Sequence, residues 1–209
     1  YLVDFAKKHD LKYVQDDMNN VVIYKPATPG YENAPTVILQ GHMDMVCAKC
    51  PEIEHDFTKD GLKLVVKDGF LSAEGTTLGG DDGIAVAYGL ALLDSTDLPH
   101  PALEVVFTVD EETGLLGADG FDCSLLKGRR MINLDSEKEG CLWISCAGGI
   151  AGNSYLPVRR LEASGRKVNV KVCGLMGGHS GAEIHKNRAS ANILMGQFLY
   201  ELSHVCGYA

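Results

Sequence analysis

Residues 36–44 have the sequence Thr-Val-Ile-Leu-Gln-Gly-His-Met-Asp, and their pattern predicts a strand that runs out into a polar end. The first part is apolar and β-branched, and it lies between Pro35 and Gly41. An unbroken apolar run of this length is typical of a strand covered on both faces, as in a parallel sheet. We therefore expect an α/β fold built around this strand.

The end of this strand carries a His-x-Asp pair. Because side chains alternate along a strand, His42 and Asp44 leave its end on the same side. An imidazole and a carboxylate placed in this way can act as a metal ligand and as the group that orients it. The triplet alone also fits a solvated histidine at a strand end, so a metal role depends on the residues further along the chain.

Two further apolar runs predict strands at 103–109 and 131–135, and a segment rich in Ala and Leu predicts a helix at 84–93. Strand, helix and strand in this order are typical of βαβ units, in which helices flank the sheet. We therefore expect a mixed, mainly parallel sheet flanked by helices. The remaining elements expected in this part are a helix at 1–9, strands at 13–15 and 21–25, and an Asp-Gly hairpin over 62–73.

Acidic side chains lie at the ends of the other two strands and before the helix. Glu111 and Glu112 follow the second strand, Asp135 ends the third, and Asp81 lies in a glycine-rich turn that opens the helix. Open α/β sheets bind ligands beyond the carboxyl ends of their strands, so these groups are expected to meet His42 at one rim. Such a gathering of carboxylates would repel without cations, and mixed N and O ligands suit divalent metals.

These residue types can supply both the metal ligands and the general base of a two-metal hydrolase. Asp81 at a tight turn could bridge two ions roughly 3.5–4 Å apart, and one of Glu111 and Glu112 could bind metal while the other acts as a general base. Each group also has a plainer interpretation: Asp81 as a helix cap, the glutamates as solvated charge, and Asp135 as a turn former. Their joint occurrence at three strand ends and one turn favours a metal-dependent hydrolase.

The composition argues against several other classes of function. The 209 residues carry a formal net charge of −9, whereas a nucleic-acid surface needs a basic patch. No apolar run approaches the ~20 residues of a membrane span, and no signal peptide opens the chain. The seven cysteines are typical of reduced thiols in a cytoplasmic protein. The Cys47-x-x-Cys50 pair lacks the second Cys/His pair that a structural zinc site would need.

The pattern changes near residue 150. Segments 153–161 and 167–175 alternate as strands do, and 184–202 has the periodicity of a helix. Between them, a glycine-rich loop contains His179, which by itself also fits a surface residue. Two strands and a helix suggest the opening of a second, α+β unit.

Five segments of the chain resemble the peptidase D (aminoacyl-histidine dipeptidase) branch of the co-catalytic zinc metallopeptidases. This larger family contains aminoacylases, carboxypeptidases and dipeptidases. The segments are Gln40–Val46, Gly75–Ile84, Glu111–Gly114, Asn133–Glu137 and Gly177–Gly181. The likeness spans nearly the whole chain, and five motifs in the same order are highly specific.

The resemblance implies a role for each candidate residue. It implies His42 and Asp135 as terminal metal ligands, Asp81 as the bridging carboxylate and Glu112 as a further ligand. It implies Glu111 as the general base. Two residues would support these groups: Asp44 would orient His42, and His179 of the lid domain would bind substrate and polarise the scissile carbonyl.

The resemblance also implies an activity and an assembly. The expected activity is hydrolysis of dipeptides, of Xaa-His type or with broad specificity, by a metal-activated water, with two Zn²⁺ ions per site or Mn²⁺ or Co²⁺ in their place. Residues 1–150 would belong to the catalytic domain and 151–209 to the beginning of a lid domain through which a cytoplasmic homodimer forms. The family's final histidine ligand is missing here, so the chain is expected to be a fragment of the enzyme. The alternatives are an aminoacylase, deacylase or carboxypeptidase of the same family, or a non-catalytic relative.

Overall fold

The computed structural model describes residues 1–136, 138–146, 148, 150, 152–160, 162, 164–178 and 183–206. The chain forms two compact units, residues 1–140 and 141–209. The predicted boundary between a catalytic and a lid domain at residue 150 stays a prediction. The first unit contains the candidate site.

A five-stranded mixed sheet forms the centre of the first unit, with the strand order β1-β2-β6-β3-β7. β3 lies between β6 and β7 and is parallel to both, whereas β2 is antiparallel to β1 and to β6. The strands are β1 (Lys12–Gln15), β2 (Val21–Lys25), β3 (Val37–His42), β6 (Leu103–Thr108) and β7 (Arg130–Asn133). The predicted α/β fold with a mixed sheet is therefore confirmed.

The register of the three parallel strands brings their carboxyl ends to one edge of the sheet. His42 lies opposite Thr108 of β6, and Gln40 lies opposite Asn133 of β7. The residues that follow each strand therefore leave the sheet side by side, as the sequence predicted.

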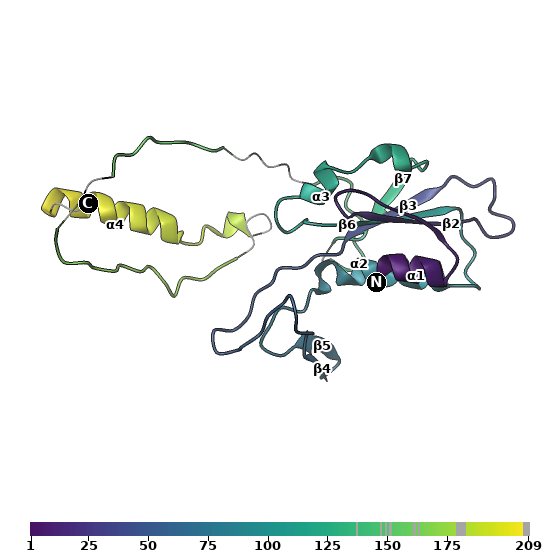
Figure 1. Ribbon diagram of the computed structural model, residues 1–209, viewed down its shortest axis with the longest axis horizontal. Coiled ribbons are helices and arrows are strands. Elements are labelled where there is room, and N and C mark those ends of the chain that lie inside the picture. The colour runs from purple at the N-terminus through teal and green to yellow at the C-terminus, as the bar shows by residue number, and fades with distance from the viewer. Residues whose placement is uncertain are drawn as a thin grey trace. The chain divides into compact units, whose positions relative to one another are not determined.

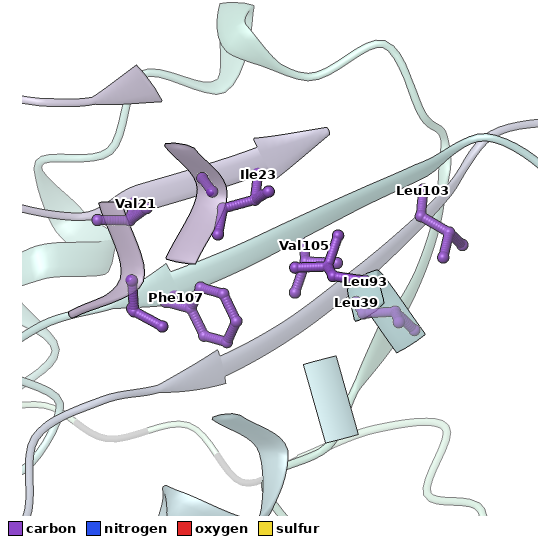
Figure 2. Close-up of a cluster of buried hydrophobic side chains, with 9 residues drawn as sticks. Val21, Ile23, Leu39, Leu93, Leu103, Val105 and Phe107 are labelled. Carbon is purple, nitrogen blue, oxygen red and sulfur yellow. The ribbon is translucent and has the colours of Figure 1, made fainter. Parts of the chain in front are cut away.

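Helices cover the two faces of this sheet (Figure 1). α1 (Leu2–Lys8) and α2 (Gly80–Asp94) lie on one face, where side chains such as Ile23, Val105 and Phe107 form the main core (Figure 2). On the other face, Val22, Ile38 and Val106 pack against the segment with α3 (Leu116–Asp119) and the 3₁₀ helix η1 (Cys123–Leu125). Alternate strand residues thus enter two separate cores, which explains the unbroken apolar runs.

A separate hairpin consists of β4 (Leu64–Lys67) and β5 (Phe70–Ala73), which pair antiparallel. Its turn residues Asp68 and Gly69 both have positive φ, 53° and 80°. A type I′ turn requires this conformation, and the Asp-Gly pair is one of its common sequences. The predicted hairpin is confirmed.

The second unit contains the 3₁₀ helix η2 (Ile184–Lys186) and α4 (Ala191–Val205). The helix predicted at 184–202 therefore begins later, because Asn187 adopts a left-handed conformation and Ser190 caps α4 by accepting from the Ile193 N–H. The strands predicted at 153–161 and 167–175 are wrong, because the described residues of both segments form no strand. Alternation is a local property, whereas a strand also needs a partner for its backbone groups.

Candidate metal centre

His42 is the last residue of β3 and the most enclosed member of the candidate site, with 1% of its surface exposed. Its Nε2 lies 3.0 Å from Asp81 Oδ1, and its Nδ1 lies 3.3 Å from Asp44 Oδ1. Burial lowers the pKa of His42, but the hydrogen bond to Asp81 and the nearby carboxylates of Asp135, Asp44 and Glu111 outweigh it and raise the pKa overall. The imidazole is thus surrounded by negative charge, which is the environment of a cation site.

Asp44 connects His42 with the acidic loop that follows β6. Its Oδ1 accepts a hydrogen bond from the Glu111 N–H and its Oδ2 accepts one from the Glu112 N–H, both at 3.1 Å. Burial raises the pKa of Asp44, but these two backbone hydrogen bonds outweigh it, so the pKa lies below its usual value. Asp44 is therefore ionised at neutral pH and holds the two glutamates beside the imidazole.

The acidic loop is fixed at its base by Asn20, which is 1% exposed. The Asn20 Oδ1 accepts from the Val109 N–H at 3.0 Å, and its Nδ2 donates to the Gly117 carbonyl at 2.9 Å. Within the loop, burial and neighbouring carboxylates raise the pKa of Glu111, although His42 opposes the shift. A glutamate with a raised pKa suits a general base that must also return its proton.

Asp81 reaches the site from the kinked start of α2, where Asp81 and Asp82 have non-helical backbone angles. Asp81 faces His42, with 64% of its side chain exposed, whereas Asp82 points inward and is 1% exposed. Burial and the charge of Asp135 raise the pKa of Asp82 to about 6. The sequence alone predicts no role for Asp82. The signal that could have found it is Gly41, because an isolated glycine in a buried strand often marks a close approach.

Asp135 follows β7, and its backbone N–H donates to Asn133 Oδ1 at 3.2 Å. The Asn133 Nδ2 in turn donates to Gln40 Oε1 at 2.6 Å, and Gln40 Nε2 donates to Thr108 Oγ1 at 3.2 Å. This row of side chains crosses β6, β3 and β7 directly below the ligand-bearing ends. It was not expected from the sequence, because only the strand register shows that the three residues are neighbours.

Two groups of side chains offer donor atoms that lie within 4.8 Å of one another. They are His42 with Glu111 and Glu112, and His42 with Asp81 and Asp135. One imidazole nitrogen and several carboxylate oxygens form a donor set that fits zinc or a similar divalent ion. The six residues predicted at this rim, Asp44 included, therefore do meet, while the division of roles among them stays a prediction. His179, the remaining predicted site residue, lies outside the described residues.

A pocket of about 260 Å³ opens beside this rim, on the sheet face that carries α3. Glu111 and Asp135 line it together with apolar side chains that include Leu115, Phe121 and Met131. The site thus has carboxylates at one side and an apolar wall at the other, as small-molecule sites commonly do.

Comparison with known proteins identifies relatives that act on peptides. Over 201 residues, the chain is 41% identical to the cytosol non-specific dipeptidase of Escherichia coli K12, and the match covers 95% of this chain and 41% of that protein. The crystal structure of aminoacylhistidine dipeptidase from Vibrio alginolyticus superposes with a TM-score of 0.70 at 38% identity, over 95% of this chain and 41% of that one. This chain is a relative of the cytosol non-specific dipeptidases. The predicted resemblance is thereby confirmed.

The dipeptidase relatives are longer than this chain, which spans about two fifths of their length. A more distant structure, the aminopeptidase PepT of Bacillus cereus, matches with a TM-score of 0.53 at 27% identity, over 66% of this chain and 37% of that one. No family model matches the chain.

Within the described part of this chain, none of the helices has the length and apolar character that crossing a bilayer requires.

Proposed function

We propose that the full-length protein is a dinuclear metal-dependent dipeptidase. The observation that carries this proposal is the convergence of His42, Asp81, Glu111, Glu112 and Asp135 at one sheet edge, in a chain 41% identical to a dipeptidase. His42, Asp81, Glu112 and Asp135 would hold the cations, with Asp81 shared between them. When bound, the cations supply positive charge that polarises the scissile carbonyl and acidifies the attacking water.

The remaining groups move the proton and hold the geometry. Glu111 takes the proton of the attacking water and passes it to the leaving amine, a role that its raised pKa supports. Asp44 holds Glu111 by accepting a hydrogen bond from the Glu111 backbone N–H. The Asp44 carboxylate also faces the Nδ1 of His42, and this contact keeps the His42 Nε2 directed at the other candidate ligands. His179 is proposed to polarise the substrate carbonyl, on the strength of its Gly177–Gly181 motif alone.

We further propose zinc as the metal, a dipeptide of Xaa-His type or of broader kind as the substrate, and a cytoplasmic homodimer formed through the lid domain. The substrate class rests on the names of the relatives, and the metal on the mixture of one imidazole with carboxylates. Mn²⁺ or Co²⁺ would fit the same donors.

The sharpest test separates the two adjacent glutamates in the full-length protein. Glu111→Gln should keep its metal content while hydrolysis of an Xaa-His dipeptide falls by roughly 10²- to 10⁴-fold, which is the usual contribution of a general base. Glu112→Gln should instead lose metal. Glu54→Gln, which makes the same change at an exposed carboxylate, serves as the control and should retain both properties.

Metal content is measured by atomic emission and hydrolysis by release of histidine. Loss of metal from Glu111→Gln with retention in Glu112→Gln would mean that the two roles are reversed. Full hydrolysis by both variants would overturn the proposed function.

A further inference from the structure

The carboxylate of Asp82 connects two ligand-bearing elements of the candidate centre. Its Oδ2 accepts a hydrogen bond from the backbone N–H of His42, at the end of β3, with an N···O distance of 3.3 Å. The same carboxylate accepts a hydrogen bond from the backbone N–H of Ala85, in the first turn of α2 after its kink. Asp82 therefore holds the backbone of His42, and its neighbour Asp81 contacts the imidazole of the same histidine.

Gly41 makes this contact possible. A Cβ atom at position 41 would lie 2.5 Å from Asp82 Oδ2 and 2.3 Å from the Cβ of Ala85, which is closer than real Cβ contacts come. Glycine within a strand is destabilising relative to alanine. Because Gly41 lies in β3, an inner strand of the sheet, the close approach of α2 and Asp82 accounts for its presence there.

A plainer explanation is that Asp82 only caps α2. Asp82 precedes the regular part of the helix, and a hydrogen bond from the N–H three residues later is the usual pattern of a cap. A cap does not need a second partner in another element, however, and caps commonly remain in contact with solvent. Asp82 is 1% exposed and reaches β3, so capping explains only one of its two contacts.

We propose that Asp82 is a positioning residue that fixes the backbone of His42 against the start of α2 and thereby sets how the His42 and Asp81 side chains face each other. The His42 Nε2 to Asp81 Oδ1 distance of 3.0 Å depends on this junction, because one partner extends from each side of it. This inference rests on the proposed function for its effect on catalysis, but its geometric part concerns metal coordination alone.

Two variants of the full-length protein separate capping from positioning. Serine caps helices about as well as aspartate, but its side chain is one bond shorter and would not reach the His42 N–H. Asp82→Ser should therefore lower the melting temperature less than Asp82→Ala does, because it keeps the cap and loses only the hydrogen bond from the His42 N–H. Both variants should change the visible absorption spectrum of the cobalt-loaded protein, which reports the geometry of the metal ligands.

In activity assays, both variants should lower kcat by roughly 10- to 100-fold, which is the usual cost of removing a group that supports a metal ligand. KM should stay within about twofold of wild type, because no substrate contact is removed. Gly41→Ala, which would push the Asp82 carboxylate away from β3, should give the same spectral change if it folds.

A wild-type cobalt spectrum and wild-type kcat in Asp82→Ser would overturn the positioning role and leave Asp82 as a cap. A wild-type protein that binds cobalt but hydrolyses no dipeptide would refute the proposed function, while the spectrum of Asp82→Ser would still decide the positioning role. A wild-type protein that binds no cobalt would overturn both.

Discussion

Replacing Asp44 by asparagine is expected to slow catalysis without removing a metal ligand. The carboxylate offers one oxygen to the Glu111 N–H and the other to the Glu112 N–H. An asparagine side chain has a single oxygen, so one of the two N–H groups would face an amide NH₂ and lose its acceptor. The loop that carries both glutamates would then be held by one neutral hydrogen bond in place of two charged ones.

The size of the effect can be worked out from these contacts. A hydrogen bond to a charged group contributes about 1.5–3 kcal/mol and a neutral one about 1 kcal/mol, so the change removes roughly 3 kcal/mol of positioning energy. If all of it is expressed in the transition state, kcat falls by about 150-fold, and if only half is expressed, by about 10-fold. We expect Asp44→Asn to lie in this range, with KM changed by less than about twofold.

The assay is steady-state hydrolysis of an Xaa-His dipeptide by the full-length protein, with metal content measured on the same sample. Asp110→Asn is the matched control, because it removes the same charge from the same loop. Asp110 has a positive φ of 54°, which asparagine tolerates well, and its side chain forms no hydrogen bond within the described part of the chain. An equal loss of activity in both variants, or a change of less than about threefold in Asp44→Asn, would refute the role given to Asp44.

Three further predictions test the site and its support in the full-length protein. Treatment with 1,10-phenanthroline should abolish hydrolysis and lower the melting temperature, and added zinc should restore both; activity that survives metal removal would contradict a metal centre. Asn20→Ala should lower the free energy of unfolding in urea by about 2–4 kcal/mol, because the Val109 N–H and the Gly117 carbonyl lose a buried partner. Gly89→Ala should cost about 1–3 kcal/mol by thermal or urea unfolding, since its Cβ would lie 2.8 Å from Val105 Cγ1.

Much of the sheet and the rim of the candidate centre could be predicted from the sequence because both depend on local patterns. The apolar runs around Leu39 and Val105 indicate strands covered on both faces, and each strand then ends in a residue type that binds metal. Once such strands are parallel neighbours, their ends meet at one edge of the sheet whatever lies between them in the chain. The convergence of His42, Glu111 and Asp135 needed only this rule and the order of the elements.

Two kinds of feature could not be predicted in this way. The alternating segments after residue 150 have the local pattern of strands, but the pattern does not show whether a partner strand is available, and the described residues there form no strand. The sequence predicts that the helix α2 starts at residue 84, because the small residues of the preceding glycine-rich segment favour a loop. The structure begins the helix at Gly80, with a kink that the aspartates occupy.

The groups that support the ligands were the hardest to predict, because their identity does not reveal their contacts. An aspartate before a helix and an asparagine in a turn have common explanations as caps and turn formers, and neither type indicates a buried position. Asp82 and Asn20 differ from such residues only in what surrounds them in the folded chain, where both are 1% exposed. Asp82 binds the backbone of His42, and Asn20 binds the backbone of Val109, two residues before Glu111. A candidate metal centre of this kind can therefore be located from its candidate ligands in the sequence, whereas the contacts that position those ligands depend on neighbours that only the structure brings together.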